Sequence, residues 1–277
     1  MINKVLLTGD TTEIVNKIHE HLNKYTQLPN LSFNTIGEIS NLELKSYETL
    51  IYLKSKNKQN GHLQDLTKNK HIACITAIPD LTVKKNHTHT KYIATQRHLL
   101  YDNHNDSISL GDLKGNIPLS EPLIRESQVF LFDLNAIRSS ELKNAAFAYP
   151  SGLFSEEATQ MFRYAGMNEM NKVVIIDNCR ENLALLISQF IWYYAEAAAI
   201  RFPDHPYFSN TVHEYVVNVD SLDLSISFYK SKTSGRWWVK IPDIPENKWK
   251  ACSYADYQEA CNDNISPDLL NVISAFG

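Results

Sequence analysis

The sequence has no long apolar run. None of its hydrophobic stretches approaches the roughly 20 residues that a helix needs to cross a bilayer. The opening MINKVLLTGD has an apolar segment too short for a signal peptide. The sequence therefore predicts a cytoplasmic protein without membrane insertion.

An excess of positive charge and paired cysteines are also missing. The chain has 27 Lys and Arg against 31 Asp and Glu, with a net charge of −4 and a pI near 6.2. It thus lacks the basic stripe of nucleic-acid-binding proteins, and we expect no nucleic-acid partner. The cysteines lie far apart and form no C-x-x-C pair, so we expect reduced, buried thiols. They are Cys74, Cys179, Cys252 and Cys261.

Motifs for nucleophilic catalysis are absent as well. No serine lies in a G-x-S-x-G turn, and no cysteine has an identifiable histidine partner. Gly9 follows a predicted strand, but a lone glycine does not make a phosphate-binding loop. Enzymes that use a serine or cysteine nucleophile are therefore disfavoured.

What the sequence does contain is a clear strand–loop–helix pattern between Val129 and Gly166. The apolar run 129–132 predicts a buried strand ending on Asp133, the place where open α/β sheets hold ligands and metals. After a loop of turn-forming residues, a helix begins near Ser155 with two acidic residues in its first turn, and it ends at Gly166. Apolar residues at i, i+3, i+4 and i+7 give this helix one buried face.

The preceding and following segments alternate between the two kinds of element. Strands are predicted at 4–8, 49–53, 72–77, 107–110 and 172–176, and helices at 12–25 and 181–202. This alternation predicts the α/β class, with a parallel sheet flanked by helices. We interpret the lysine-rich run Lys54–Lys58 as solvated surface, and Ser120 as the N-cap of a short helix.

The pattern changes near residue 206. Strands are predicted at 215–219, 222–229 and 236–241, and a helix at 254–263 with Ser253 as its N-cap. They predict a small antiparallel sheet with Trp237 and Trp238 on opposite faces. We expect an α/β core over 1–205 and a β-hairpin and helix extension over 206–277, packed on the core.

Several segments resemble a known superfamily. The strand and loop of the central segment are LFDLNAIRSS and YPSGLFSEEA, and its helix ends in RYAGM. The likeness continues through QFIWYYAEAAAIRFPDHP, FYKSKTSGRWWVKIP and CSYADYQEACND. Together they resemble the ureohydrolases (arginase, agmatinase and formimidoylglutamase), most closely the formimidoylglutamase-like branch of Bacteroidetes. The resemblance implies a three-layer arginase-like fold. The first seventy residues match poorly. Because the family normally has strands before the first one predicted here, we expect an N-terminally shortened member.

The resemblance also implies where metal ligands should lie, and most of those positions have changed. The family's Gly-Gly-x-His turn has its nearest counterpart in Thr8-Gly9-Asp10, which lacks the histidine. The family's Asp-Ala-His-x-Asp corresponds to the stretch from Thr76 to Asp80, where Ile78 replaces the histidine and only Asp80 is kept. A hydroxyl and an aliphatic side chain cannot replace a carboxylate and an imidazole as metal ligands.

The second family motif, Ser-x-Asp-x-Asp, is reduced in the same way. Asp133 is kept, while Asn135 stands in place of the second aspartate and brings no negative charge. Asp177 stands where the family has a glutamate that contacts the cationic group of the substrate. The vestigial site residues are therefore Asp80, Asp133 and Asp177, which are too few for a binuclear manganese site. If any metal binds, Asp80, Asp133 and Asn135 are the candidate ligands.

A histidine site is a separate possibility. His87 and His89 form an H-x-H pair that would share one face of a strand, and His98 or His104 could complete a three-histidine set. No carboxylate accompanies the pair, so we favour a histidine-rich polar loop.

Two hypotheses from different classes follow. In the favoured one, the chain is a ureohydrolase-fold protein that has lost its metals, has no cofactor, and serves as a binding, scaffolding or regulatory module. Its partner is then a protein or a second copy of the chain. In the alternative, it is a manganese-dependent hydrolase of a linear amidine or guanidine, with Asp80 and Asp133 as ligands and Asp177 holding the cationic substrate nitrogen.

Overall fold

The structure is a computed structural model of the 277-residue chain. It describes residues 4–37, 39, 43–55, 61–79, 90–99, 107–142, 149–240, 249–267 and 269–270, without the side chains of 61–63 and 209. The chain divides into two compact units, Met1–Arg201 and Phe202–Gly277.

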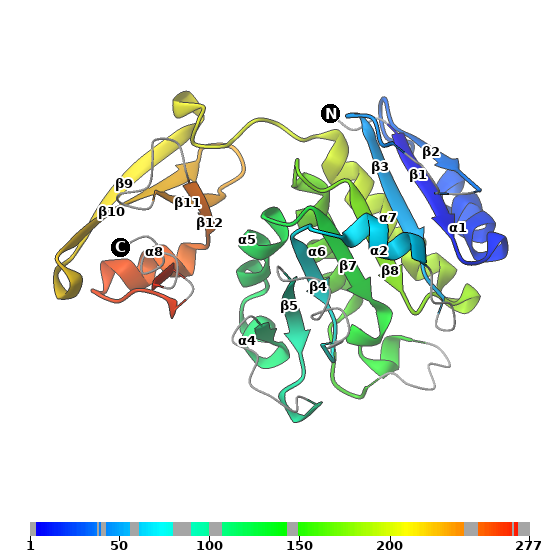
Figure 1. Ribbon diagram of the computed structural model, residues 1–277, viewed down its shortest axis with the longest axis horizontal. Coiled ribbons are helices and arrows are strands. Elements are labelled where there is room, and N and C mark those ends of the chain that lie inside the picture. The colour runs from blue at the N-terminus through cyan, green and yellow to red at the C-terminus, as the bar shows by residue number, and fades with distance from the viewer. Residues whose placement is uncertain are drawn as a thin grey trace. The chain divides into compact units, whose positions relative to one another are not determined.

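The first unit is built on an eight-stranded sheet in the order β2-β1-β3-β8-β7-β4-β5-β6 (Figure 1). Every neighbouring pair in this sheet is parallel. The inner strands β3 and β4 are buried along their whole length, as the apolar sequence of a two-sided parallel strand requires. The strands are β1 (Lys4–Gly9), β2 (Ser32–Thr35), β3 (Glu48–Leu53), β4 (Ile72–Ile75), β5 (Thr90–Thr95), β6 (Ser107–Ser109), β7 (Val129–Asp133) and β8 (Val173–Asp177).

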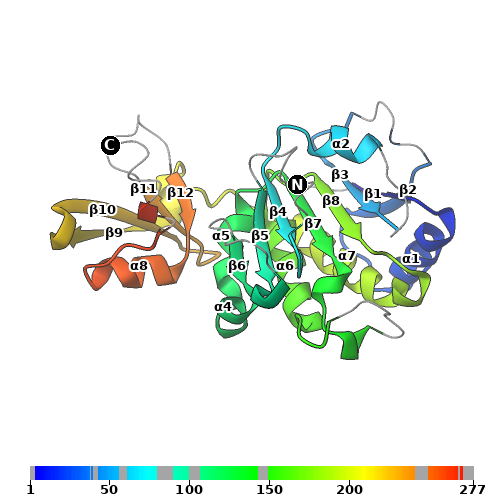
Figure 2. The same cartoon turned by 60° about the horizontal axis from the view of Figure 1, so that its bottom comes forward.

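Helices lie on both faces of this sheet (Figure 2). The larger core packs one face against five helices, which are α1 (Thr12–Lys24), α4 (Leu110–Gly115), α5 (Ser120–Arg125), α6 (Ser155–Met167) and α7 (Ala184–Ala199). The smaller core lies on the opposite face, and the partly buried Leu66 of α2 (Gly61–Thr67) packs against it. The predicted α/β class and three-layer parallel arrangement are therefore confirmed.

The aromatic side chains of β7 anchor the larger core. Phe132 lies 5.0 Å from Phe162 of α6 and 5.8 Å from Phe190 of α7, measured between ring centroids. The two helices approach closely at Gly166, where an added Cβ would lie 2.2 Å from the backbone oxygen of Tyr194. This packing fixes β7, and with it the end of the strand where Asp133 lies.

Some element predictions were wrong in detail. Strands β2 and β5 were not recognised, and the long helix predicted at 181–202 is a 3-10 turn (Glu181–Leu183) followed by α7. Ser120 does not cap a helix, because its hydroxyl donates to the carbonyl of Ile117 and α5 has no side-chain cap. In the described part of the chain, no helix is long and apolar enough to span a membrane.

The second unit contains an antiparallel sheet in the order β12-β11-β10-β9. Trp237 stacks on Tyr257, with ring centroids 4.8 Å apart, while Trp238 contacts His205 at 5.9 Å, so the two tryptophans face opposite ways as predicted. Ser253 caps α8 through Asp256, which also confirms the prediction. The elements are β9 (Val212–Val219), β10 (Leu224–Ser231), β11 (Trp237–Lys240), β12 (Trp249–Cys252) and α8 (Tyr254–Cys261); β12 was not predicted.

Candidate functional site

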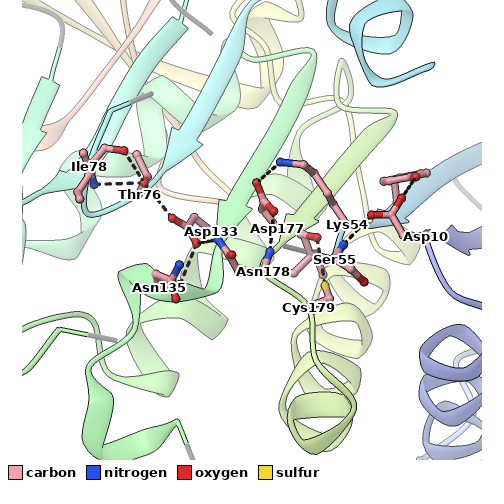
Figure 3. A network of polar contacts seen from close by, with 12 residues as sticks. Asp10, Lys54, Ser55, Thr76, Ile78, Asp133, Asn135, Asp177, Asn178 and Cys179 are labelled. Carbon is pink, nitrogen blue, oxygen red and sulfur yellow. Dashed lines mark hydrogen bonds and ion pairs between the residues drawn. The ribbon is translucent and has the colours of Figure 1, made fainter. Parts of the chain in front are cut away.

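The carboxyl ends of four adjacent strands bring polar side chains together. Lys54 follows β3, Asp177 ends β8, Asp133 ends β7, and Thr76 follows β4. Figure 3 shows these side chains in one network of hydrogen bonds and ion pairs. This edge is where parallel α/β sheets hold their ligands, so it is the candidate functional site.

Asp133 is held by three donors from the chain itself. Its Oδ1 accepts the Asn135 backbone N–H at 2.9 Å and the Asn178 side-chain amide at 2.7 Å. Its Oδ2 lies 3.2 Å from the Thr76 hydroxyl, which also contacts the Ile78 carbonyl at 2.9 Å. Burial raises the pKa of the Asp133 carboxyl, and the nearby charge of Asp177 adds to this, while the three hydrogen bonds lower the pKa in part.

Asp177 is held differently, by an ion pair. Its Oδ2 lies 2.6 Å from the Lys54 ammonium, and the Lys54 and Asp177 side chains are 30% and 20% exposed. Its Oδ1 accepts the backbone N–H of Asn178 at 2.7 Å. Partial burial of both partners makes the pair stronger than one on an open surface.

Asn178 links the two carboxylates. Its backbone N–H binds Asp177 while its side-chain amide binds Asp133. Its φ of 60° lies in the left-handed region, which asparagine tolerates better than most residues. The backbone conformation directly after β8 therefore lets one residue bridge both acids.

The backbone of Lys54 is fixed on both sides. Its N–H donates to the Ile176 carbonyl at 2.8 Å, and its carbonyl accepts the Cys179 N–H at 2.9 Å. The lysine thus continues the pairing of β3 with β8, and its side chain emerges beside Asp177. The interpretation of Lys54–Lys58 as solvated surface does not hold for Lys54, whose side chain is 30% exposed and paired with Asp177, while residues 56–58 lie outside the described part of the chain.

Asp10, at the end of β1, belongs to a neighbouring set of contacts. Its carboxylate accepts the Tyr52 hydroxyl and, at 2.8 Å, the Ser55 N–H. Strand β3 lies between β1 and β8, so the strand end next to Asp177 is that of Lys54. The expected counterpart of the Gly-Gly-x-His turn at Thr8-Gly9-Asp10 is therefore separated from the two acids by strand β3.

The thiol nearest the site is shielded. Cys179 is buried, its Sγ contacts the Ile176 carbonyl at 3.1 Å, and burial raises the pKa of the thiol well above its usual value. A protonated buried thiol is a poor nucleophile, which agrees with the absence of a cysteine–histidine motif. The expectation that all four thiols are buried was wrong for Cys261, which is exposed.

The structure brings together only part of the predicted site. Asp133 and Asp177 lie in one network, and Asn135 contributes its backbone N–H to Asp133. Asp80, like His87, His89 and His104, lies outside the described residues. His98 lies in a 3-10 turn (Arg97–Leu99).

Two residues of the network were not singled out from the sequence. They are Lys54 and Asn178, and each directly follows a strand: ETLIYL in the first case and VVIID in the second. A search for polar residues at the first two positions after every predicted parallel strand would have found both.

The described residues do not fit a binuclear metal centre. Each carboxylate oxygen of Asp133 and Asp177 has a donor from the chain within hydrogen-bonding distance, and one donor is an ammonium. Within residues 4–37, 39, 43–55, 61–79, 90–99, 107–142, 149–240, 249–267 and 269–270, no three His, Cys, Asp or Glu residues form a potential metal-binding group.

Comparison with solved structures identifies the fold. The oxidized Trypanosoma cruzi formiminoglutamase with Mn²⁺ at pH 6.0 matches with a TM-score of 0.57 and 12% identity, covering 73% of this chain and 94% of that chain. The chain has the arginase-like α/β fold. The formimidoylglutamase of Bacillus subtilis matches with a TM-score of 0.56 and 9% identity, covering 73% and 88% of the two chains. An arginase superfamily protein from T. cruzi matches with a TM-score of 0.55 and 11% identity, covering 73% of this chain and 94% of that chain.

Comparisons of the sequence alone find no match. No protein-family model matches the sequence, and neither does any curated protein. At identities this low, the shared fold does not establish a shared activity.

Proposed function

We propose that this chain is a cytoplasmic, non-catalytic protein on the ureohydrolase fold, related to the formimidoylglutamase-like branch of Bacteroidetes. It acts as a binding, scaffolding or regulatory module, and its partner is a protein or a second copy of the chain. No metal and no cofactor takes part.

The observation that carries the proposal is the Lys54–Asp177 ion pair. A structure of similar fold, the T. cruzi formiminoglutamase, contains Mn²⁺. In this chain, the acids at the carboxyl ends of β7 and β8 have an ammonium 2.6 Å from Asp177 Oδ2 as their cation. A divalent ion about 4 Å from that ammonium would be repelled by several kcal/mol in a partly buried site. The ion would therefore have to displace the lysine before it could bind.

Asp133 supports the same conclusion from its hydrogen bonds. The Asn135 N–H and the Asn178 amide donate to its Oδ1, and the Thr76 hydroxyl, whose single proton is shared with the Ile78 carbonyl, lies 3.2 Å from its Oδ2. An oxygen that accepts a hydrogen bond can also ligate a metal, but a cation at Asp133 would compete with these donors. Binding would leave partly buried donors such as the Asn178 amide without a partner, at a cost of about 1–3 kcal/mol each.

The alternative, a manganese-dependent amidine or guanidine hydrolase, assigns different roles to the same residues. It requires Asp177 to bind a cationic substrate, although Asp177 Oδ2 is already paired with Lys54. It also takes Asp133 as a metal ligand, although both oxygens of Asp133 lie within hydrogen-bonding distance of donors from the chain. The proposal is therefore better supported than the hydrolase.

An activity assay separates the two. The purified chain is incubated with excess Mn²⁺ and then with N-formimidoyl-glutamate, agmatine or arginine, and ammonia, formamide and urea release are measured. A known formimidoylglutamase serves as the positive control. We expect no turnover above the metal-only blank. Product release that disappears in Asp133→Ala would show that the chain is a hydrolase and would overturn the proposal.

A further inference from the structure

Strand β9 leaves one long edge of the second unit open. In the order β12-β11-β10-β9, it pairs with β10 along all eight residues without a register shift, and among the described residues it pairs with no other strand. Figure 1 shows the two strands running side by side. An edge strand of this length presents a row of unpaired peptide groups to other chains.

Among the described residues, several of the usual protective devices are missing from this edge, whose one acidic side chain is that of Glu214. The sequence of β9 is VHEYVVNV, which contains no proline or lysine, and its continuous register excludes a bulge. Val216, at its centre, is 63% exposed. An exposed β-branched residue in the middle of an unprotected edge strand favours pairing with another strand.

The hydrogen-bond pattern shows which peptide groups are available. The Lys232 N–H donates to the Thr211 carbonyl at 2.8 Å, so these residues form a hydrogen-bonded pair of the β9–β10 ladder. Such pairs alternate with pairs whose peptide groups point away. The peptide groups of Val216, and of Glu214 and Asn218 two residues to either side, therefore point outward.

We propose that β9 pairs antiparallel with β9 of a second copy of this chain, with Val216 opposite Val216. The two-fold axis then passes beside Val216, and the two four-stranded sheets become one continuous sheet. In this register, Glu214 lies opposite Asn218 of the second copy, so a carboxylate faces an amide that can donate to it. About six backbone hydrogen bonds form between the copies.

The neighbouring registers are worse. Outward peptide groups of one copy must face outward peptide groups of the other, so one strand can slide past the other only by two residues at a time. Each such slide moves the centre of the two-fold pairing by one residue. Centring on Val217 places Glu214 opposite Asp220, which sets two acids against each other. Centring on Tyr215 places Glu214 opposite Val216, which leaves the exposed valine beside a charge. The side chains thus favour the register centred on Val216.

This pairing does not depend on whether the first unit is catalytic. Its test is the oligomeric state of the full chain, measured by sedimentation velocity over a range of concentrations. The informative variant is Val216→Pro, because the N–H it removes points outward and the β9–β10 ladder is unaffected. The matched control is Ser225→Lys, an exposed position of the neighbouring strand, opposite Asn218.

We expect the native chain and Ser225→Lys to sediment as dimers and Val216→Pro as a monomer with an unchanged circular dichroism spectrum. A native chain that stays monomeric, including one that instead binds an added peptide at this edge, overturns the proposal. A dimer that persists in Val216→Pro also overturns it, because another surface must then hold the copies together.

A cross-linking experiment tests the register. In a Cys261→Ser background, which removes the exposed native thiol, Val216→Cys should form an intermolecular disulfide under mild oxidation, since facing residues lie about 5.5 Å apart between Cα atoms. Asn218→Cys should not, because residue 218 faces 214. The opposite pattern would contradict the Val216-centred pairing.

Discussion

Replacing Lys54 by glutamine removes the ammonium that lies 2.6 Å from Asp177 Oδ2 and keeps a side chain of similar bulk. Of the donors to Asp177 in the described part of the chain, the Asn178 N–H then remains, with the carboxylate of Asp133 close by. The two side chains of the ion pair are 30% and 20% exposed, so the expected cost lies between those of an exposed and a buried pair. We expect a loss of about 2 kcal/mol in the free energy of unfolding.

In thermal unfolding, this loss should lower the midpoint of the first unit by roughly 4–8 °C, since about 2–4 °C corresponds to 1 kcal/mol at this size. The variant should also respond to divalent cations. Without the ammonium, Asp177 and Asp133 can share an added ion, which stabilises by about 1.4 kcal/mol at ten times its dissociation constant. Differential scanning calorimetry with and without Mn²⁺ measures both effects.

The chain contains a closely matched control. The ammonium of Lys114 lies 2.6 Å from Glu157 Oε2, and the two side chains are 30% and 18% exposed. Lys114→Gln should lose a similar amount of stability but gain no response to Mn²⁺, because its carboxylate is not at the carboxyl edge of the sheet. An unchanged midpoint in Lys54→Gln, or a Mn²⁺-dependent shift already present in the native chain, would refute the reasoning.

Three further predictions concern the core and the site. Because burial raises the pKa of Asp133, the folded chain binds more protons than the unfolded chain between the ordinary and raised values, and stability falls as pH rises through that window. In urea unfolding measured across pH, Asp133→Asn should abolish this fall in stability. Asp133→Ala should lower the free energy of unfolding by about 1–3 kcal/mol because it leaves the Asn178 amide unpaired. In the same urea assay, Gly166→Ala should lower the free energy of unfolding by about 3 kcal/mol because the added Cβ would meet a backbone oxygen. Its control is Gly115→Ala, which has nothing within 4 Å of the added Cβ and should change the free energy of unfolding by less than about 1 kcal/mol. Thiol titration of the native chain should find one reactive cysteine, since Cys261 is exposed and the other three are buried. All four should react after denaturation. A second rapidly reacting thiol in the native chain would contradict the buried placement of the other three.

The sequence predicts most of the first unit because its strongest signals are local. The run 129–133 and the amphipathic segment from Ser155 became β7 and α6 with nearly the expected bounds. Strand β2 escaped notice because its sequence SFNT is polar and mostly exposed, so it carries no apolar pattern. Its strand conformation comes from pairing with β1, a tertiary effect that local sequence does not encode.

The candidate site was predictable only in part. Asp133 and Asp177 were found because each ends an apolar strand, and parallel strands end at one edge. Lys54 was misassigned because a run of charged residues normally indicates a solvated surface, and composition does not distinguish its first member from the others. The placement of Lys54 beside Asp177 depends on β3 lying next to β8, although more than 100 residues separate them in sequence. That neighbourhood follows from topology rather than from local sequence.

Metal content of the native chain tests the central claim most directly. The purified protein is analysed by plasma mass spectrometry before and after incubation with excess Mn²⁺ and desalting, alongside Lys54→Gln and Asp133→Ala. Near-zero retained metal in the native chain, unchanged in Asp133→Ala, is the predicted result. Retention approaching two ions per native chain, lost in Asp133→Ala, would contradict the account.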